Sequence, residues 1–186
     1  MNVQDILNTA KDQMSKSLDY TKSQFAKVRT GRASASLVDS VKCDYYGTPT
    51  PISQISSISV PDAKTIVIQP WDRSTLGIIE KAVQSADLGF NPQNDGNIIR
   101  IPVPPLTEER RKDFVKLCKK YGEEGKIAVR NVRRDEMDSL KKSEKDKVIT
   151  EDDKKWGEAE IQKITDEYIK KIDDALIHKE KELMDN

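Results

Sequence analysis

Three arginine side chains lie close together in the stretch VRNVRRDEMDSLKK, which runs from Val129 to Lys142. They are Arg130, Arg133 and Arg134, and valines stand between and before them. The guanidinium group presents a rigid fork of N–H donors that matches the oxygens of a phosphate group. The stretch therefore predicts a phosphate-binding surface on a helix whose other side is apolar.

The basic residues continue toward the N-terminus along the same predicted helix. Taking about 100° of rotation per residue, the predicted buried stripe comprises Phe114, Cys118, Tyr121, Gly125, Ala128 and Val132. Basic residues gather about 100–200° away from it, namely Lys112, Lys116, Lys119, Lys126, Arg130, Arg133 and Arg134. Residues 110–134 hold ten basic and three acidic residues, a local charge of +7 in a chain of zero net charge.

A straight basic stripe suits a polyphosphate backbone. Aromatic residues make up only 5% of the chain, which argues against a platform that stacks single-stranded bases. Structured RNA or a duplex, bound through phosphates and shape, is the better expectation. The alternative is an ordinary solvated face, and Glu123 in the same sector interrupts the stripe.

Catalytic motifs are missing from the sequence. Without a G-x-x-x-x-G-K-[ST] phosphate loop, the chain is not expected to hydrolyse nucleotides itself. The single histidine, His178, and the distant cysteines Cys43 and Cys118 have neither metal-site nor nucleophile spacing. The acidic residues that follow Thr150 are better explained by helix capping than by a metal. We predict no catalytic residues, no metal and no cofactor.

Prolines and charges divide the chain into flanks and a middle. All eight prolines lie between Pro49 and Pro105, and residues 31–105 carry 13 of the 64 charged residues. Proline fixes φ and removes a backbone donor, so long helices are predicted only in the flanks. The middle reads as a small α/β unit, with strands at VKCDYY, ISSISV, TIVIQPW and NDGNIIRIPV and a helix at STLGIIEKAVQSAD.

Three amphipathic helices are predicted in the flanks. The apolar stripe of the first ends before Gly31 and comprises Leu7, Ala10, Met14, Leu18, Thr21, Phe25 and Val28. Thr107 is expected to cap the second, which runs to about Lys147, and Thr150 to cap the third. Their apolar faces need one another, and the short link after Asp146 favours antiparallel packing.

This pattern predicts an α+β protein with an elongated, discontinuous three-helix bundle and an inserted small α/β domain. Gly122 and Gly125 are a predicted weak point of the second helix, since each costs about 1 kcal/mol relative to alanine. A kink is easiest there.

An ordered set of motifs along the whole chain resembles the bacterial ribosome recycling factors. The motifs are KVRTGRAS, YYGTPTPISQI, WDRS, DLGFNP, IRIPVPPLTEERRKD and AVRNVRRD. The resemblance implies a near-L-shaped, two-domain protein, in which residues 1–30 and 106–186 form an rRNA-binding bundle and residues 31–105 the insert. It implies a two-strand hinge, at Thr30, Gly31, Arg32 and Ala33 and at Val103, Pro104, Pro105 and Leu106.

The resemblance also implies a function. Such proteins bind the large ribosomal subunit after termination and, with elongation factor G and the GTP that this partner hydrolyses, split the ribosome and release mRNA and tRNA. It implies rRNA contacts at Arg111, Arg130 and Arg133, with Arg29 and Arg32 near the hinge. The helical spacing alone adds Arg134 to this set.

Two other classes of function stay open from the residues. A generic helical adaptor would bind proteins through its bundle, and a nucleotide-hydrolysing enzyme would turn over nucleotide alone. No apolar run approaches the ~18 residues of a membrane span, and the N-terminus has no signal pattern. A soluble, cytoplasmic monomer that does not bind membranes is therefore expected.

Overall fold

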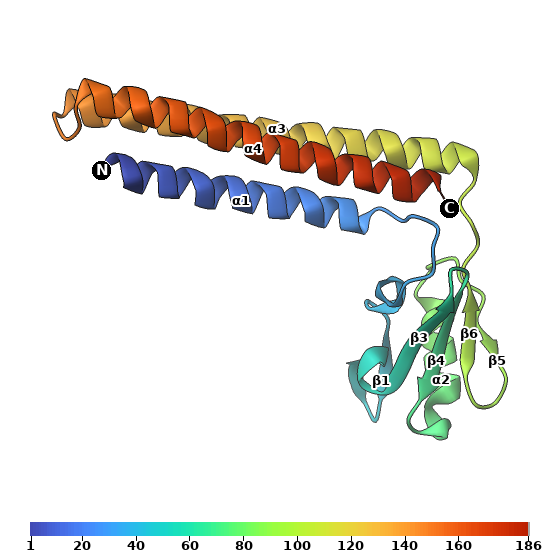
Figure 1. Ribbon diagram of the computed structural model, residues 1–186. Coiled ribbons are helices and arrows are strands. Elements are labelled where there is room, and N and C mark those ends of the chain that lie inside the picture. Colours follow the sequence, from blue (N-terminus) through green and yellow to red (C-terminus); the bar gives the residue numbers. More distant parts are fainter. Residues whose placement is uncertain (186) are drawn as a thin grey trace. The chain divides into compact units, whose positions relative to one another are not determined.

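The computed structural model describes residues 1–185. The chain separates into two compact units, Met1–Thr30 with Glu108–Asp185 and Gly31–Thr107. The first is helical and the second carries the β-sheet (Figure 1). The predicted α+β class is confirmed.

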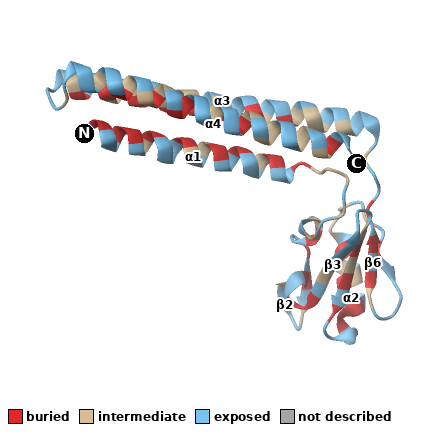
Figure 2. Ribbon diagram, viewed as in Figure 1, coloured by how far each residue is buried: buried red, intermediate tan, exposed pale blue. Residues whose placement is uncertain are grey.

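Three long helices form the first unit: α1 (Val3–Lys27), α3 (Glu108–Lys145) and α4 (Glu151–Met184). Each packs against the other two, and buried residues recur along all three (Figure 2). The stripe predicted for α1 is confirmed, since all seven of its residues are buried. Its apolar side chains face a core that includes Val129, Leu140, Ile161 and Ile172.

The start of α4 is fixed by a capping box, as Thr150 predicted. The Thr150 hydroxyl accepts a hydrogen bond from the Asp153 N–H at 3.1 Å, and the Asp153 carboxylate accepts from the Thr150 N–H at 3.0 Å. The Asp153 carboxylate also accepts from the Thr150 hydroxyl at 2.8 Å, and the bonds that it accepts from the Thr150 backbone and side chain lower its pKa. The acidic first turn therefore serves the helix end, where it complements the helix dipole.

The glycines of α3 do not interrupt it. Helix α3 runs unbroken through Gly122 and Gly125, and both are buried. A Cβ atom at Gly125 would overlap the Thr21 side chain of α1, and one at Gly122 would lie 3.2 Å from a Leu176 methyl of α4. The sequence left open whether a kink forms here, and the helix is continuous, because these glycines let the helices approach closely and the packing gained offsets their low helix propensity.

The second unit is a four-stranded antiparallel sheet with one helix. Its strands are β3 (Ser56–Asp62), β4 (Thr65–Pro70), β5 (Gln93–Asn94) and β6 (Ile99–Pro102), in the spatial order β3-β4-β6-β5. Helix α2 (Leu76–Ser85) contributes to the core. The fully buried isoleucines of this core are Ile52, Ile66, Ile68, Ile79, Ile99 and Ile101. Strand β4 lies between β3 and β6 and contains the TIVIQP run that the sequence predicted as a strand.

A separate hairpin completes the unit. Strands β1 (Lys42–Tyr45) and β2 (Thr48–Pro51) pair antiparallel around a two-residue turn. Both turn residues, Tyr46 and Gly47, have positive φ, at 50° and 82°. The twist of such a turn matches that of the paired strands. The sequence did not predict β2, whose TPTP sequence holds two prolines.

Candidate nucleic-acid interface

Helix α3 presents its valines to the bundle and its arginines outward. Val129 is fully buried and Val132 nearly so. Of the predicted buried stripe, Cys118, Gly125 and Val132 are buried, whereas Phe114, Tyr121 and Ala128 are only half-buried. The prediction omitted Val129 because it assumed that α3 contacts its neighbours along a single narrow line. Helix α3 packs against two helices, so its buried face is broader.

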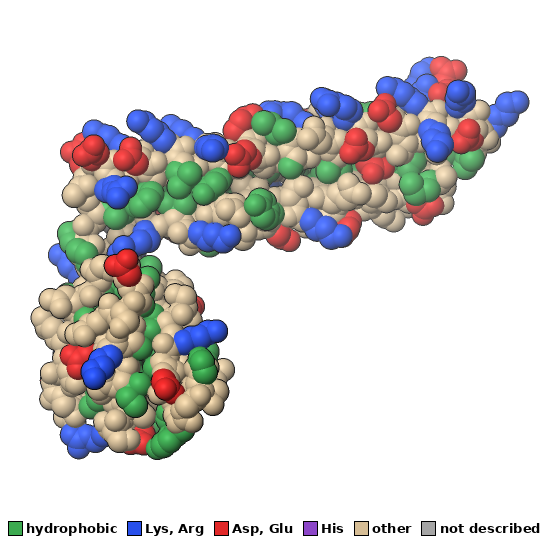
Figure 3. Space-filling view, turned by 180° about the vertical axis from the view of Figure 1, so that it is seen from behind, with side chains coloured by type: hydrophobic (Ala, Val, Ile, Leu, Met, Phe, Trp, Pro, Cys, Tyr) green, Lys and Arg blue, Asp and Glu red, His purple; other side chains and the backbone are tan. Residues whose placement is uncertain are grey.

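Much of the predicted basic stripe is paired within the bundle. Within residues 1–185, four of its seven members make ion pairs. Lys126, only 19% exposed, contacts Asp173 of α4 at 3.0 Å, and this hydrogen bond raises its pKa. Lys and Arg side chains accordingly alternate with Asp and Glu along the bundle surface (Figure 3). The local charge of +7 on residues 110–134 is therefore partly offset by acidic residues outside this segment, such as Asp173.

Arg130 shares this pairing but stays accessible. Its guanidinium lies 3.0 Å from the Glu123 carboxylate, and the two side chains are 43% and 52% exposed. The hydrogen bond from Arg130, followed by that from Lys126, lowers the pKa of Glu123. Such an exposed pair contributes little stability, so Arg130 can exchange Glu123 for a phosphate at little cost.

Arg133 is held by a neutral side chain of the neighbouring helix. One of its terminal nitrogens donates to the Gln162 amide oxygen at 2.9 Å. The Gln162 amide nitrogen donates in turn to the Asp166 carboxylate at 2.8 Å. This chain of bonds orients the guanidinium without neutralising it by direct ion pairing, and arginine has five N–H donors in all. Arg133 is thus positioned and still has donors for a ligand.

Arg134 and Arg111 differ in their surroundings. Arg134 is exposed and makes no hydrogen bond or ion pair within the described part of the chain. Arg111, near the start of α3, donates to the Met184 carbonyl at 3.4 Å and so bonds the end of α4. It lies 19 residues before Arg130 on the same helix, roughly 28 Å along the axis at 1.5 Å per residue. The structure therefore groups Arg130, Arg133 and Arg134 and places Arg111 apart from them.

The remaining two candidate arginines lie in the segment that follows α1. Arg29 is half-buried and belongs to the helical unit, whereas Arg32 is exposed and belongs to the sheet unit. Only Arg29 is therefore fixed relative to the arginines of α3.

The two predicted hinge segments meet at the edge of the sheet unit. The Ala33 N–H donates to the Ala63 carbonyl at 2.8 Å, and the Val103 N–H donates to the Lys64 carbonyl at 2.7 Å. Both acceptors lie in the turn between β3 and β4. Gly31 has a φ of +82°, and a Cβ atom there would lie 3.1 Å from the Leu106 side chain. Glycine is required at that position by both its conformation and its close neighbour.

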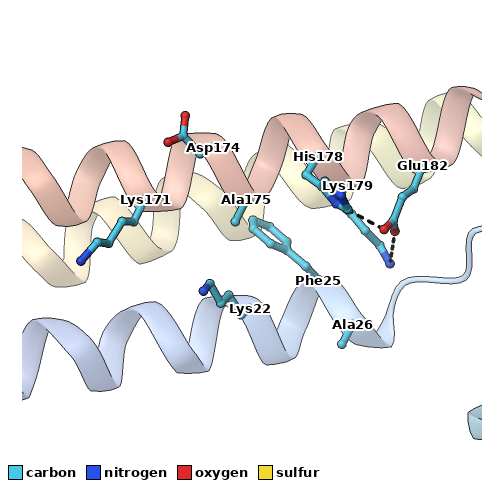
Figure 4. A pocket seen from close by; sticks show the side chains of 9 residues that line it. All are labelled: Lys22, Phe25, Ala26, Lys171, Asp174, Ala175, His178, Lys179 and Glu182. Atoms are coloured by element: carbon cyan, nitrogen blue, oxygen red, sulfur yellow. Dashed lines mark ion pairs between the residues drawn. The ribbon is translucent and has the colours of Figure 1, made fainter.

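A groove of about 600 Å³ between α1 and α4 was not predicted (Figure 4). Its basic residues are Lys22, Lys171, His178 and Lys179. Acids balance them, since Glu182 lies 3.2 Å from the exposed His178 ring and 3.6 Å from the Lys179 ammonium. The groove therefore does not extend the basic face of α3. Periodicity on single helices cannot reveal it, because two helices form it.

The described residues offer little for catalysis. Cys43 and Cys118 are buried and free, and burial raises the pKa of both thiols, which disfavours the nucleophilic thiolate. No group of three or more His, Cys, Asp or Glu residues within residues 1–185 could hold a metal ion. No helix in that range is long and apolar enough to cross a membrane.

Comparison with known proteins assigns the family. The family model "Ribosome recycling factor" matches residues 21–184. The ribosome-recycling factor of Nitratidesulfovibrio vulgaris is 55% identical over 185 residues, covering 100% of both chains. That of Bacillus licheniformis is 53% identical over 180 residues, covering 97% of each.

Solved structures agree with these relatives. A solution structure of a ribosome recycling factor has a TM-score of 0.76 and 43% identity, covering 100% of this chain and 99% of the other. A second likeness has a TM-score of 0.64 and 45% identity, covering 99% and 100%. It is the Thermus thermophilus recycling factor, in a structure that also holds Escherichia coli elongation factor G on the Escherichia coli post-termination complex. The fold and these relatives define a translation factor. The chain belongs to the ribosome recycling factor family.

Proposed function

We propose that the chain binds the large ribosomal subunit through Arg130, Arg133 and Arg134 of α3 and contacts the phosphates of its rRNA. The observation that carries this is the state of Arg133, which Gln162 orients at 2.9 Å without neutralising its charge. Arg130 has an exposed partner that a phosphate can replace. Arg111, Arg29 and Arg32 would make further contacts.

Elongation factor G is the second partner in this proposal. The related Thermus thermophilus protein is found together with that factor on a post-termination complex. The chain has no phosphate loop in its sequence, so the partner would hydrolyse GTP and drive separation of the subunits, with release of mRNA and tRNA. In this division of labour the helical unit anchors the protein and the sheet unit transmits the force. The site of action is the cytoplasm, where translating ribosomes are found.

The segments 30–33 and 103–106 would act as the hinge. Their ends are fixed to the turn between β3 and β4 by Ala33 and Val103. The proline pair Pro104–Pro105 restricts φ, so motion would concentrate at Gly31 and its neighbours.

Two measurements test the proposal together. Sedimentation of the purified protein with large subunits at two salt concentrations should show strongly salt-dependent binding, because phosphate contacts release counterions. Light scattering should show subunit splitting only when elongation factor G and GTP are both present. A helical adaptor predicts weak salt dependence and no preference for ribosomes, and GTP turnover by the isolated chain would contradict the assigned roles.

A further inference from the structure

The sheet unit contains a pocket that the arginines of α3 do not explain. It has a volume of about 260 Å³ and is lined by Tyr45, Gln54, Ile55, Trp71, Asp72 and Thr75. These residues come from β1, from the segment between β2 and β3, and from the segment that joins β4 to α2. The pocket is closed on its inner side by Ile55 and Thr75, which are buried.

Two aromatic side chains, Tyr45 and Trp71, line this pocket. Trp71 is 71% exposed and Tyr46 is 82% exposed. The Tyr46 ring packs edge-on against the Tyr45 ring, with centroids 4.7 Å apart. Tyr45 lines the pocket together with Trp71, so the pocket has two aromatic lining residues, and one of them also contacts Tyr46. Exposed aromatic surface of this kind marks an interaction site.

The charge at the pocket is negative. Asp72 is its one ionisable carboxylate and is held in place, because it accepts a hydrogen bond from the Ser74 N–H at 2.9 Å. No lysine or arginine lines the pocket. The adjacent Arg73 is directed elsewhere, toward the Gly96 carbonyl at 3.2 Å and the Asn97 side chain. A phosphate group would meet Asp72 unfavourably, which argues against a nucleic acid as the ligand.

A guanidinium group fits this combination of features. Its planar face stacks on indole and phenol rings, and its N–H donors match a carboxylate. We infer that the pocket binds an arginine side chain of a protein partner, stacked on Trp71 and paired with Asp72. The inference rests on the proposed function, since the partner would be a protein met when the chain is bound to the ribosome.

A functional assay with matched variants tests this inference. Trp71→Ala should reduce splitting by elongation factor G at least tenfold, while Trp71→Phe retains part of the activity and large-subunit binding stays unchanged. Asp72→Asn keeps a residue that can cap the following turn and removes only the charge, so it should reduce splitting severalfold. Trp156→Ala is the control, because Trp156 is 52% exposed on α4 and should tolerate the change. Parental splitting by Trp71→Ala would overturn the inference.

A titration separates this inference from the proposed function. In full-length protein carrying Trp156→Phe, Trp71 is the only tryptophan. N-acetyl-arginine amide at millimolar concentration should change its fluorescence, and the neutral citrulline analogue should not. Equal responses to the two probes, or no response to arginine, would contradict the pocket assignment. If the parent protein fails to split ribosomes, the proposed function is wrong. The titration alone then tests whether the pocket binds an arginine side chain.

Discussion

Charge reversal at Arg133 should weaken large-subunit binding strongly. The guanidinium donates one hydrogen bond to Gln162, at 2.9 Å, and its remaining donors are available to a phosphate. Loss of one charge-assisted hydrogen bond costs about 1.5–3 kcal/mol, which corresponds to about 10- to 100-fold in affinity. Repulsion by the new carboxylate in Arg133→Glu should place the effect at the upper end. Among the described residues 1–185, the substitution removes the bond to Gln162, at about 1 kcal/mol.

The assay is sedimentation with purified large subunits over a series of salt concentrations. Removing one phosphate contact should lower the slope of log K against log salt by roughly one. Arg133→Lys should be intermediate, since the charge remains and the fork of donors is lost. Gln162→Leu should weaken binding severalfold with an unchanged slope, because it removes the support of Arg133 and leaves its charge. Lys16→Glu on α1 repeats the charge change at a lysine that pairs with Asp12 and lies outside the set of α3 arginines.

Two results would refute the reasoning. If Arg133→Glu binds like the parent at moderate salt, the arginines of α3 form only a solvated face. If Lys16→Glu weakens binding as much as Arg133→Glu, the protein is held by net charge and not by a defined contact. Circular dichroism of each variant should first show intact helices.

Three further predictions concern single residues. Gly125→Ala should lower the melting temperature, since overpacking costs about 1–3 kcal/mol. The control is Gly77→Ala in α2, which should not lower it, because a Cβ atom there has nothing within 4 Å. Burial raises the pKa of Glu136. The parent protein should therefore lose stability as the pH rises from about 4.3, the pKa of an unperturbed Glu, through the higher pKa of the folded state. Glu136→Gln should raise the melting temperature at pH 7, and this gain should shrink toward pH 4. A lower melting temperature for that variant at pH 7 would contradict this. Glu123→Gln should tighten large-subunit binding up to severalfold in the sedimentation assay by releasing Arg130. Weaker binding would contradict the competition between Glu123 and a phosphate for Arg130.

The helices could be predicted because local chemistry determines them. The Thr150 capping box and the stripe of α1 are both visible as residue spacings, and both are present in the structure. Strand β2 was missed because Pro49 and Pro51 read as strand breakers. They are tolerated in the outlying hairpin, where β2 pairs only with β1 and some of its N–H groups need no partner.

The surroundings of the arginines could not be predicted in the same way. Their outward direction follows from helical spacing, but Gln162 and Asp173 come from α4, and a pattern along α3 alone contains no information about them. For the same reason the role of Gly125 could not be decided from the sequence. Its low helix propensity is a local property, whereas the Thr21 contact that requires it comes from α1.

The attachment of both connecting segments to the β3–β4 turn has a consequence for synthesis on the ribosome. Because Ala33 and Val103 are anchored side by side there, the sheet unit holds its own ends together and can fold as soon as residue 107 has emerged. Helix α1 emerges before its partners, since α3 begins 81 residues after α1 ends and α4 begins 124 residues after it ends. At roughly 5–20 residues per second, its apolar stripe stays uncovered for about 4 seconds or more. Helix α1 is therefore made before the sheet unit but buried after it, and nascent α1 is the segment most in need of protection.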